Sequence, residues 1–281
     1  MHNLISTNFH DWTSRLAAEN NFSLKLSQIE GVSIVMVPEK TVAFAFIELR
    51  DNEIVFKMIE LFNHLNKGFQ LITVWEDQWI QSNEVIRSRI SSLLGQTKRI
   101  HGRATKVKRI DSHQLNNFLS IHHLNVITAA KYKYGLFFKD ELVAVASFSA
   151  GKPMPSRGEN YRSYELIRFA NFKDHTVVGG LSKLIKFFIE EVKPSDIMTY
   201  ADLEWSNGEG YEKLGFKKEG ITESQQFWVK EGEWLRYYAH KLPHSVLSMA
   251  ESNESEEQLM IRLGYVRIKN QGNLKFRLVI K

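Results

Sequence analysis

Short apolar runs alternate with amphipathic segments along this chain, as in a protein that mixes β-strands with α-helices. In the N-terminal third, the pattern predicts helices and strands in the order α-β-β-α-β-α. The expected segments are a helix over 1–30, strands 31–37, 41–47 and 69–75, and helices 54–67 and 79–94. This order predicts a compact α/β unit.

From about residue 97 onward, the pattern predicts a mixed sheet with flanking helices. The expected strands are 105–110, 134–138, 142–148, 164–171 and 196–202, and the expected helices are 111–122 and 180–192. A hairpin about Gly232, a helix over 255–263 and a final pair of strands, 265–269 with 274–280, complete the chain. We therefore expect two α/β (α+β) domains, 1–96 and 97–281.

Composition narrows the class of protein. The 281 residues are 43% apolar, which supports two buried cores, and no run reaches the roughly 18–20 apolar residues that span a bilayer. The start of the chain lacks the basic and apolar stretches of a secretory signal. Because there is no cysteine, disulfides and thiolate metal sites are excluded. We expect a soluble, cytoplasmic protein with no membrane contact.

The positive charge is concentrated in one segment. The formal net charge is +5, and residues 96–140 hold nine Lys or Arg against two Asp or Glu. Such a patch is suited to nucleic-acid phosphates, although a strand with one solvated basic face gives the same pattern. The candidate nucleic-acid contacts are Lys98, Arg99, Arg103, Lys106, Lys108 and Arg109.

A strand, a Gly-Gly turn and an apolar helix follow one another at Val177-Val-Gly-Gly-Leu-Ser-Lys183. Backbone N–H groups and the helix dipole converge at such a turn, so it predicts an anion site suited to a pyrophosphate. The candidate cofactor-binding residues are Val178, Gly179, Gly180, Leu181, Ser182 and Lys183. Lys183 would add charge, and Ser182 would add a hydroxyl group.

After the next strand comes Asn207-Gly-Glu-Gly-Tyr-Glu-Lys-Leu-Gly-Phe216, which resembles the last motif of the GNAT acyltransferase fold. In that family the loop before the helix cradles the pyrophosphate of acetyl-CoA, and the motif Tyr lies near the thioester sulfur. The resemblance implies an acyl-CoA-dependent transferase with acetyl-CoA or another acyl-CoA as donor. It places the Tyr on Tyr211.

Residues 100–281 are similar, more narrowly, to the Mom-like branch of that fold. This branch is linked to modification of adenine in DNA, with acetyl-CoA as donor and an iron-dependent step proposed. Its His falls on His123 in Phe118-Leu-Ser-Ile-His-His123, its strand Arg on Arg168, its loop Ser on Ser182 and its Asp on Asp202. The resemblance implies catalytic roles for His123, Arg168, Asp202 and Tyr211, with His123 and Asp202 as candidate iron ligands.

Each of these residues also has a plainer interpretation. His123 can be a surface or capping residue, Asp202 can cap a turn, and Tyr211 can be a core aromatic. Arg168 can be buried in an ion pair with Glu165 or Asp202. The remaining alternatives concern His122 and His175 as weak metal ligands, Ser182 as an ordinary helix residue, and Trp205, Trp228 and Trp234 as base-stacking or hairpin aromatics.

The N-terminal unit resembles the Vsr-type nuclease fold, a PD-(D/E)XK relative. The resemblance lies in Val32-Ser-Ile-Val-Met-Val-Pro38, Val42-Ala-Phe-Ala-Phe46 and Trp75-Glu-Asp-Gln-Trp79. The family's metal-binding Asp falls on Ser33 and its Glu on Ala45, so the resemblance implies a nuclease fold that has lost its metal site. Residual cleavage through Glu48, Asp51 and Glu76 is the alternative.

Together these features favour a GNAT-fold transferase that modifies a nucleic-acid base, fused to a degenerate Vsr-like domain. One alternative is a plain N-acetyltransferase that acts on a small amine or a protein. The other is a non-catalytic DNA-binding protein of phage or mobile-element origin.

Overall fold

The computed structural model describes residues 2–49, 52–125 and 128–280. Asp51 lies outside these residues. The chain forms two compact mixed α/β units, and neither unit is continuous in sequence. Unit 1 comprises residues 1–83, 202–207 and 222–273, and unit 2 comprises residues 84–201, 208–221 and 274–281. The two compact units differ from the expected domains in one large segment, 222–273, and the domain assignment itself stays a prediction.

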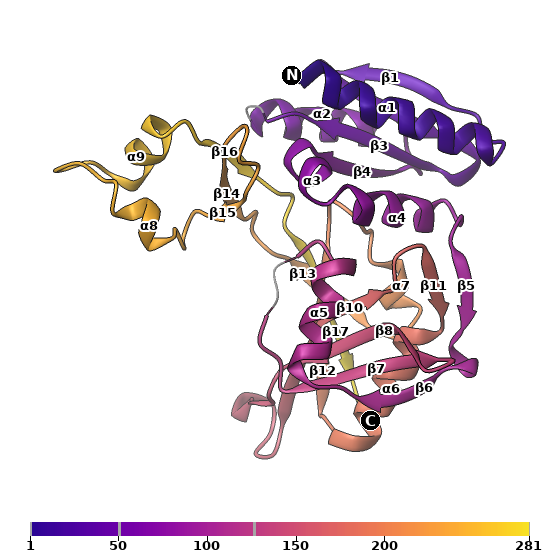
Figure 1. The fold of residues 1–281 in the computed structure, drawn as a ribbon. Coiled ribbons are helices and arrows are strands. Elements are labelled where there is room, and N and C mark those ends of the chain that lie inside the picture. Colours follow the sequence, from indigo (N-terminus) through magenta and orange to yellow (C-terminus); the bar gives the residue numbers. More distant parts are fainter. Residues whose placement is uncertain (1, 50–51, 126–127, 281) are drawn as a thin grey trace. The chain divides into compact units, whose positions relative to one another are not determined.

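Unit 1 is built on a four-stranded sheet in the order β1-β2-β3-β4, in which β3 and β4 are parallel and the other pairs are antiparallel (Figure 1). A second sheet has the order β15-β14-β16. The elements are α1 (His2–Glu19), β1 (Lys25–Ile29), β2 (Val32–Val37), β3 (Val42–Ile47), α2 (Asn52–Leu65), β4 (Gln70–Trp75), α3 (Glu76–Gln81), β14 (Gln226–Val229), β15 (Tyr237–Tyr238), α8 (His244–Leu247), α9 (Glu256–Arg262) and β16 (Val266–Lys269).

Helices cover both faces of the first sheet. On one face, Met58 and Phe62 of α2 pack in a buried cluster with Ile34 of β2. On the other face, the ring of Phe9 in α1 lies 5.1 Å from that of Phe46 in β3. Because β3 is buried on both faces, it reads as a continuous apolar run rather than as an alternating strand.

Unit 2 contains an eight-stranded sheet whose main path is β13-β17-β12-β10-β8-β7-β6, with β9 paired to β10, and a parallel pair, β5 with β11. Its elements are α4 (Asn83–Leu93), β5 (Lys98–His101), β6 (Lys106–Arg109), α5 (Ser112–His122), β7 (Tyr132–Phe138), β8 (Glu141–Phe148), β9 (Lys152–Pro153), β10 (Arg162–Asn171), β11 (His175–Val178), α6 (Gly180–Val192), β12 (Asp196–Asp202), α7 (Glu209–Glu212), β13 (Lys217–Ile221) and β17 (Asn273–Val279). Residues Asn83, Asp202 and Asn273 at element ends belong to unit 1.

Two helices sandwich this sheet. Phe118 of α5 packs with Val145 of β8 and Ala170 of β10 on one face. On the other face, the ring of Phe188 in α6 stacks on that of Phe148 at 4.0 Å. The start of α5 follows the expected capping pattern, since Asp111 and Gln114 form a reciprocal capping box.

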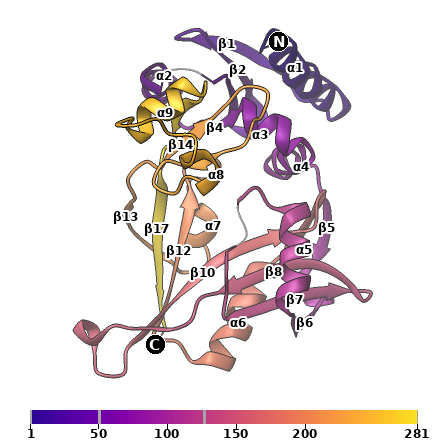
Figure 2. The same ribbon diagram turned by 60° about the vertical axis from the view of Figure 1, so that its left-hand side comes forward.

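Strands β10 and β12 separate before they end. They pair in parallel only from Ser163 with Asp196 to Leu166 with Thr199, while β10 continues to Asn171 (Figure 2). A register shift in the β10–β8 pairing lies at the same place, between Leu166 and Arg168. Peptide groups of separated strands need other hydrogen-bond partners, so the split is a natural entry point for a ligand with amide groups.

Three expectations about the elements were wrong. The helix expected within 1–30 ends at Glu19, and β1 follows it. The helix expected over 79–94 is two helices, α3 and α4. The final strands do not form a hairpin, because β16 pairs with β14 and β17 pairs with β13. Among the described residues, no helix is both long and apolar enough to cross a membrane.

Candidate active site

Helix α6 begins at a turn that only glycine adopts easily. Gly179, its N-cap, has a φ of 74° in the left-handed region, and it contributes no side-chain cap. Strand β11 leads into this turn and is held by its parallel pairing with β5. The first N–H groups of an uncapped helix need an acceptor from elsewhere, and the helix dipole favours an anion there.

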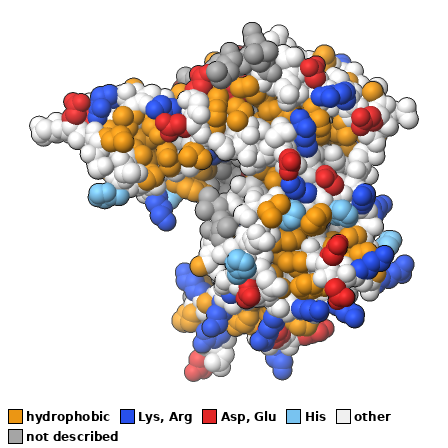
Figure 3. All heavy atoms as spheres, viewed as in Figure 1, with side chains coloured by type: hydrophobic (Ala, Val, Ile, Leu, Met, Phe, Trp, Pro, Cys, Tyr) orange, Lys and Arg blue, Asp and Glu red, His pale blue; other side chains and the backbone are white. Residues whose placement is uncertain are grey.

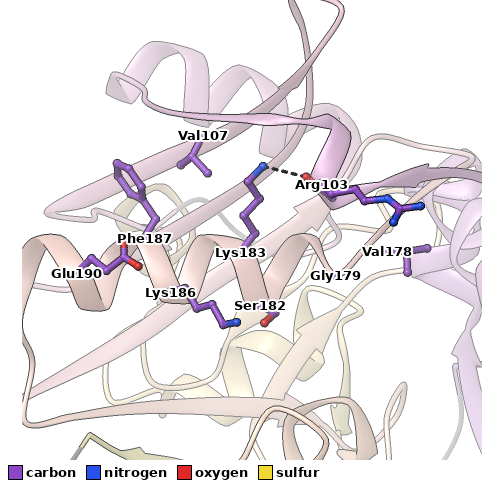
Figure 4. A pocket seen from close by; sticks show the side chains of 10 residues that line it. Arg103, Val107, Val178, Gly179, Ser182, Lys183, Lys186, Phe187 and Glu190 are labelled. Carbon is purple, nitrogen blue, oxygen red and sulfur yellow. Dashed lines mark hydrogen bonds between the residues drawn. The ribbon is translucent and has the colours of Figure 1, made fainter.

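A pocket of about 430 Å³ opens beside this turn (Figure 4). Its walls come from the β5–β6 turn, from β6, and from the start and one face of α6. The lining residues are Gly102, Arg103, Val107, Val178, Gly179, Ser182, Lys183, Lys186, Phe187 and Glu190. Four of the six residues expected to hold a cofactor therefore line one cavity, namely Val178, Gly179, Ser182 and Lys183.

The other two expected residues, Gly180 and Leu181, lie outside the lining. Gly180 is buried, and a Cβ there would come within 2.9 Å of the Val177 side chain. Gly179 differs, since a Cβ there would meet nothing within 4 Å. The open side of the turn is thus at Gly179, while Gly180 allows close packing behind it.

Lys183 does not point its charge freely into the pocket, contrary to its expected role. Its Nζ donates to the carbonyl oxygen of Gly102 at 2.9 Å and also to that of Thr105. The Thr105 hydroxyl donates to the same Gly102 oxygen at 2.6 Å. Lys183 therefore ties the β5–β6 turn to α6.

Gly102 allows this turn to approach the start of α6. A Cβ at Gly102 would lie 2.9 Å from the Val178 carbonyl oxygen and 3.3 Å from that of Gly179. Backbone atoms cannot move aside as a flexible side chain can, so a larger residue here would push the two turns apart. The pocket wall thus depends on a glycine that was not singled out from sequence.

His123 lies at the C-terminal end of α5, and it is neutral. Burial and the nearby cations Arg89 and Arg168 lower its pKa to about 3. Its Nδ1 accepts the Asn125 backbone N–H at 3.0 Å, so the proton of the neutral ring is on Nε2. In this state His123 can donate a hydrogen bond, but neither nitrogen offers a lone pair to a metal ion or to an acidic proton.

Arg168 lies in β10 beyond the point where β10 and β12 separate. Its guanidinium donates to the Ile167 carbonyl oxygen at 2.8 Å and to the Thr128 hydroxyl at 3.3 Å. Arg89 of α4 was not expected from sequence, yet its charge acts on both His123 and Tyr211. Three of the four expected catalytic residues therefore share one electrostatic environment, and Arg89 belongs to it.

Tyr211 is half-buried against the rings of Phe216 and Phe276, each at 5.6 Å. Burial raises its pKa, so its hydroxyl keeps its proton at neutral pH. The Thr199 side chain opposes this pKa shift, and the Thr199 hydroxyl donates to the Leu166 carbonyl oxygen at 3.0 Å. Since Leu166 and Thr199 are the last paired residues of β10 and β12, Tyr211 lies near the point where the strands separate.

Glu165 is a second residue that was not expected to be catalytic. Glu165 comes one residue before Leu166, the last residue of β10 that pairs with β12. Its backbone N–H donates to the Ser149 hydroxyl at 2.9 Å. Burial raises the pKa of its carboxyl group, and the Arg168 charge opposes that shift. A half-buried carboxylate with a raised pKa is suited to accept a proton near neutral pH. This candidate role of Glu165 depends on residues that are distant in the chain, so the sequence alone did not indicate it.

Asp202 belongs to unit 1, whereas His123 belongs to unit 2. The Asp202 carboxylate accepts the Glu204 backbone N–H at 3.0 Å, which is the turn-capping role considered as its alternative. Across residues 2–49, 52–125 and 128–280, no group of three or more metal-binding side chains comes together. The two tentative ligands therefore stay a prediction.

The other histidine candidates serve local roles. His122 Nδ1 accepts the Lys173 backbone N–H at 3.2 Å, and burial lowers the pKa of His122 to about 4. His175 Nδ1 contacts its neighbouring Lys173 carbonyl oxygen at 2.9 Å. Trp205, Trp228 and Trp234 are each less than 10% exposed within unit 1, so they match the core interpretation rather than an open stacking surface.

The basic segment lies on the surface of unit 2. All six candidate nucleic-acid residues are exposed, and they lie on or beside β5 and β6. Figure 3 shows several Lys and Arg side chains along the lower right edge of the view. Two of the six are already engaged: Arg109 pairs with Glu191 at 2.6 Å, and the Lys108 ammonium lies 4.8 Å from the Phe137 ring centre. Arg103 lines the pocket.

Three acidic residues of unit 1, Glu76, Asp77 and Glu204, are buried with partners. Glu76 is fully buried, and its carboxylate accepts the Leu49 N–H at 3.2 Å. Asp77 forms two hydrogen bonds with Arg236, at 2.5 and 3.0 Å, and Glu204 accepts the Trp75 indole N–H at 2.7 Å. Ala45, where the Vsr-type frame has Glu, is wholly buried in β3. In the described part of unit 1, these three carboxyl groups therefore do not form an exposed cluster for a divalent ion.

No protein-family model and no curated protein matches this chain. The chain has structural similarity to GNAT-fold acetyltransferases. One is a Bacillus subtilis acetyltransferase in complex with CoA, with a TM-score of 0.34, 13% identity, and coverage of 63% of this chain and 99% of that one. Another is a GNAT family acetyltransferase from Elizabethkingia anophelis with acetyl-CoA bound, with a TM-score of 0.33, 11% identity and the same coverage.

A third similar structure is N-acetylglutamate synthase from Neisseria gonorrhoeae in complex with coenzyme A and N-acetyl-glutamate. Its TM-score is 0.36 at 9% identity, and the match covers 84% of this chain and 51% of that one. Similarities at these levels assign no residue roles, and they do not test the Mom-like or Vsr-type resemblance. Function is therefore inferred from the geometry of the site.

Proposed function

We propose that this protein is an acyl-CoA-dependent transferase, with acetyl-CoA or another acyl-CoA as donor. The observation that carries the proposal is the uncapped start of α6 at Gly179, which opens on a pocket with basic side chains. The N–H groups of Gly180, Leu181 and Ser182 would hold the pyrophosphate. The separated edges of β10 and β12 would take the amide groups of the pantetheine arm.

The residues around the separated strands supply the chemistry for acyl transfer. The acceptor atom would form a bond to the acyl carbon as the carbon–sulfur bond breaks. Glu165 would take the proton from the acceptor, and the Tyr211 hydroxyl would give its proton to the leaving sulfur. The Nε2–H of His123 and the Arg168 guanidinium would donate hydrogen bonds to the developing oxyanion.

Iron has no part in this proposal. The Nδ1 atom of His123 is occupied by the Asn125 N–H, and the proton is on Nε2. Asp202 caps a turn in unit 1. These residues therefore fit a hydrogen-bonding role better than an iron site, although they remain the candidates that the Mom-like resemblance names.

Calorimetry with CoA and acetyl-CoA tests the donor. Gly179→Asp places a carboxylate where the pyrophosphate would lie, and we expect affinity to fall at least about tenfold, since one charged contact is worth roughly that much. Gly179→Asn is the matched control, because Asn has the same shape and also tolerates a left-handed backbone. Equal affinity in the wild type and Gly179→Asp would contradict the proposal.

For the acceptor, we propose a nucleic-acid base, adenine by analogy with the Mom-like resemblance. Support comes from the exposed cations Lys98, Arg99 and Lys106 in the same unit as the pocket. Mass spectrometry of DNA nucleosides after co-expression tests this acceptor. Transfer to an amine or peptide panel without DNA affinity at low salt would favour a plain N-acetyltransferase. DNA binding without CoA binding would favour a non-catalytic protein.

For the N-terminal region, we propose a Vsr-like nuclease fold without nuclease activity. Ser33 and Ala45 replace the expected carboxylates, and Glu76 is held inside the unit by the Leu49 N–H. Cleavage of DNA with Mg²⁺ or Mn²⁺ that is lost in Glu76→Ala would contradict this proposal.

A further inference from the structure

Three aromatic side chains form a continuous row on the surface of unit 2. The ring of Phe172, directly after β10, lies 4.5 Å from the His122 ring of α5 and 5.3 Å from the His175 ring of β11. Phe172 is 41% exposed, and both histidines are half-buried. We call these three residues the aromatic surface. An exposed ring that is flanked by two others offers a face on which a planar ligand can stack.

The backbone of Lys173 holds both imidazoles of the aromatic surface. His122 Nδ1 accepts the Lys173 N–H at 3.2 Å, and His175 Nδ1 donates to the Lys173 carbonyl oxygen at 2.9 Å, since a carbonyl oxygen only accepts. Burial and the Lys173 charge lower the pKa of His122 to about 4, so this ring is neutral. The two imidazoles are therefore ordered before a ligand binds, which lowers the entropic cost of stacking.

An exposed cation borders the aromatic surface. Lys98 of β5 is the register partner of His175, so the two side chains lie on the same face of the β5–β11 pair. Within the described ranges the Lys98 ammonium has no ion-pair or hydrogen-bond partner, whereas Lys173 is paired with Glu84. Asp174 is also exposed beside His175, so an anionic group would lie toward Lys98. Rings next to such a cation fit a chain of bases that phosphates connect.

We propose that the aromatic surface and Lys98 bind single-stranded DNA, with one base stacked on Phe172 and a neighbouring phosphate at Lys98. This inference rests on the proposed nucleic-acid acceptor, and it names the form of the nucleic acid and the surface that holds it. The single-stranded form follows from the geometry. Bases inside a duplex are stacked on one another, so they have no free ring face for Phe172.

The aromatic surface lies on the same face of the sheet as Arg168. Ala170 of β10 packs against α5, and the Phe172 ring lies 6.5 Å from the Phe118 ring of that helix. Alternate residues of a strand face the same side, so Arg168, Ala170 and Phe172 share this face. Four residues of strand, about 13 Å, separate Arg168 from Phe172. A DNA strand that is stacked on Phe172 can therefore present another of its bases near Arg168.

Fluorescence anisotropy of the full chain tests this inference without CoA. The probe is a short labelled DNA of mixed sequence, either single-stranded or annealed to its complement, and we expect the single strand to bind more tightly. Phe172→Leu keeps an apolar side chain but removes the ring. Its affinity for the single strand should fall at least about fivefold, as for one lost stacking contact, with unchanged salt dependence.

The cation is tested by the salt dependence of binding. Lys98→Gln should lower the slope of log affinity against log salt by about 0.7, the value for one phosphate of a single strand. Phe138 and Lys139 supply matched controls, because they form a similar pair of ring and ammonium, 5.5 Å apart, at the turn between β7 and β8. Phe138→Leu and Lys139→Gln should match the wild type in affinity and in slope.

The outcomes separate this inference from the proposed function. If the wild type and Phe172→Leu bound the single strand equally well, the inference would be overturned and the nucleic-acid acceptor would be left intact. Tighter binding of the duplex, or an equal loss in Phe138→Leu, would also overturn the inference. A wild type that binds neither form at low salt would overturn the inference and the nucleic-acid acceptor together. Calorimetry with CoA tests the donor independently of all these results.

Discussion

Two sets of charged or titratable side chains, one in each unit, have contrasting surroundings. In unit 1, Asp77 and Glu204 are at most 2% exposed, and each has a specific partner inside the unit. In unit 2, Arg103 and Lys186 line an open cavity. Burial raises the pKa of the Glu204 carboxyl group, whereas the Asp77 carboxylate is paired with Arg236. Both respond to the cost of desolvation, so this first set contributes to stability. Exposed charges that have no partner beside a cavity indicate instead that a ligand of opposite charge can bind there.

The largest expected effect is a loss of stability when the Asp77 carboxylate loses its partner. Arg236→Met removes the only cation that is hydrogen-bonded to this buried carboxylate in the described structure, and a broken buried pair costs about 3–5 kcal/mol. We expect the urea midpoint of unfolding to fall accordingly. The double variant Asp77→Asn/Arg236→Met should recover part of the loss, since no buried charge remains unpaired. A change below about 1 kcal/mol in Arg236→Met would contradict this view.

The next effect is on catalysis in unit 2. A general base typically contributes about 10²–10⁴-fold, so Glu165→Gln should lower acyl transfer by at least about a hundredfold. The raised pKa of Glu165 means that the wild-type rate should rise with pH as this carboxyl group loses its proton. That acidic limb should be absent in Glu165→Gln.

The control for this experiment is Glu141→Gln, a change at an exposed carboxylate at the start of β8. Its pH–rate profile, measured with the acceptor that the panel identifies, should match that of the wild type. If Glu165→Gln kept the acidic limb, the proton would be going to another group.

The third prediction concerns how the stability of unit 1 depends on pH. Burial, followed by repulsion from Asp202, raises the pKa of Glu204 from 4.5 to about 8. The folded state therefore binds this proton more tightly than the unfolded state does, so the contribution of Glu204 to stability is fully present below pH 4.5 and is lost as pH rises through about 8. Glu204→Gln keeps an acceptor for the Trp75 N–H but has no proton to lose, so this part of the decline should disappear.

Thermal unfolding between pH 5 and 9 measures this difference. The melting temperature of the wild type should fall more steeply over that range than that of Glu204→Gln. Identical slopes would show that Glu204 does not titrate in this window. The affinity for CoA should not change with this substitution, because none of the residues that line the pocket belongs to unit 1.

The features that sequence predicted best are local ones. The Gly-Gly turn and the apolar face of α6 are encoded within a dozen neighbouring residues, so the sequence was enough to predict the turn and the helix that follows it. The anion site at this turn stays a prediction. The same holds for the capping box at Asp111. Short-range chemistry decides such elements, and it can be followed in order along the chain.

The features that sequence missed depend on distant pairings. The final strands have hairpin-like spacing, yet β16 pairs with β14 and β17 with β13, because 222–273 folds with unit 1. Arg89 and Glu165 become candidates only once α4, α5 and β10 are brought together. Lys183 was expected to bind an anion because its sequence position is right. Only the fold shows that two carbonyl groups occupy its ammonium.

The smallest expected effect tests whether Lys183 binds the ligand or holds the β5–β6 turn. If Lys183 bound the pyrophosphate directly, Lys183→Met would weaken CoA at least about tenfold, as one lost charged contact should. If its ammonium only holds the β5–β6 turn, the same variant should weaken CoA by about threefold at most, since the turn remains partly held by Gly102 and Thr105. Calorimetry with CoA measures the difference. A loss of tenfold or more would show that Lys183 contacts the ligand itself.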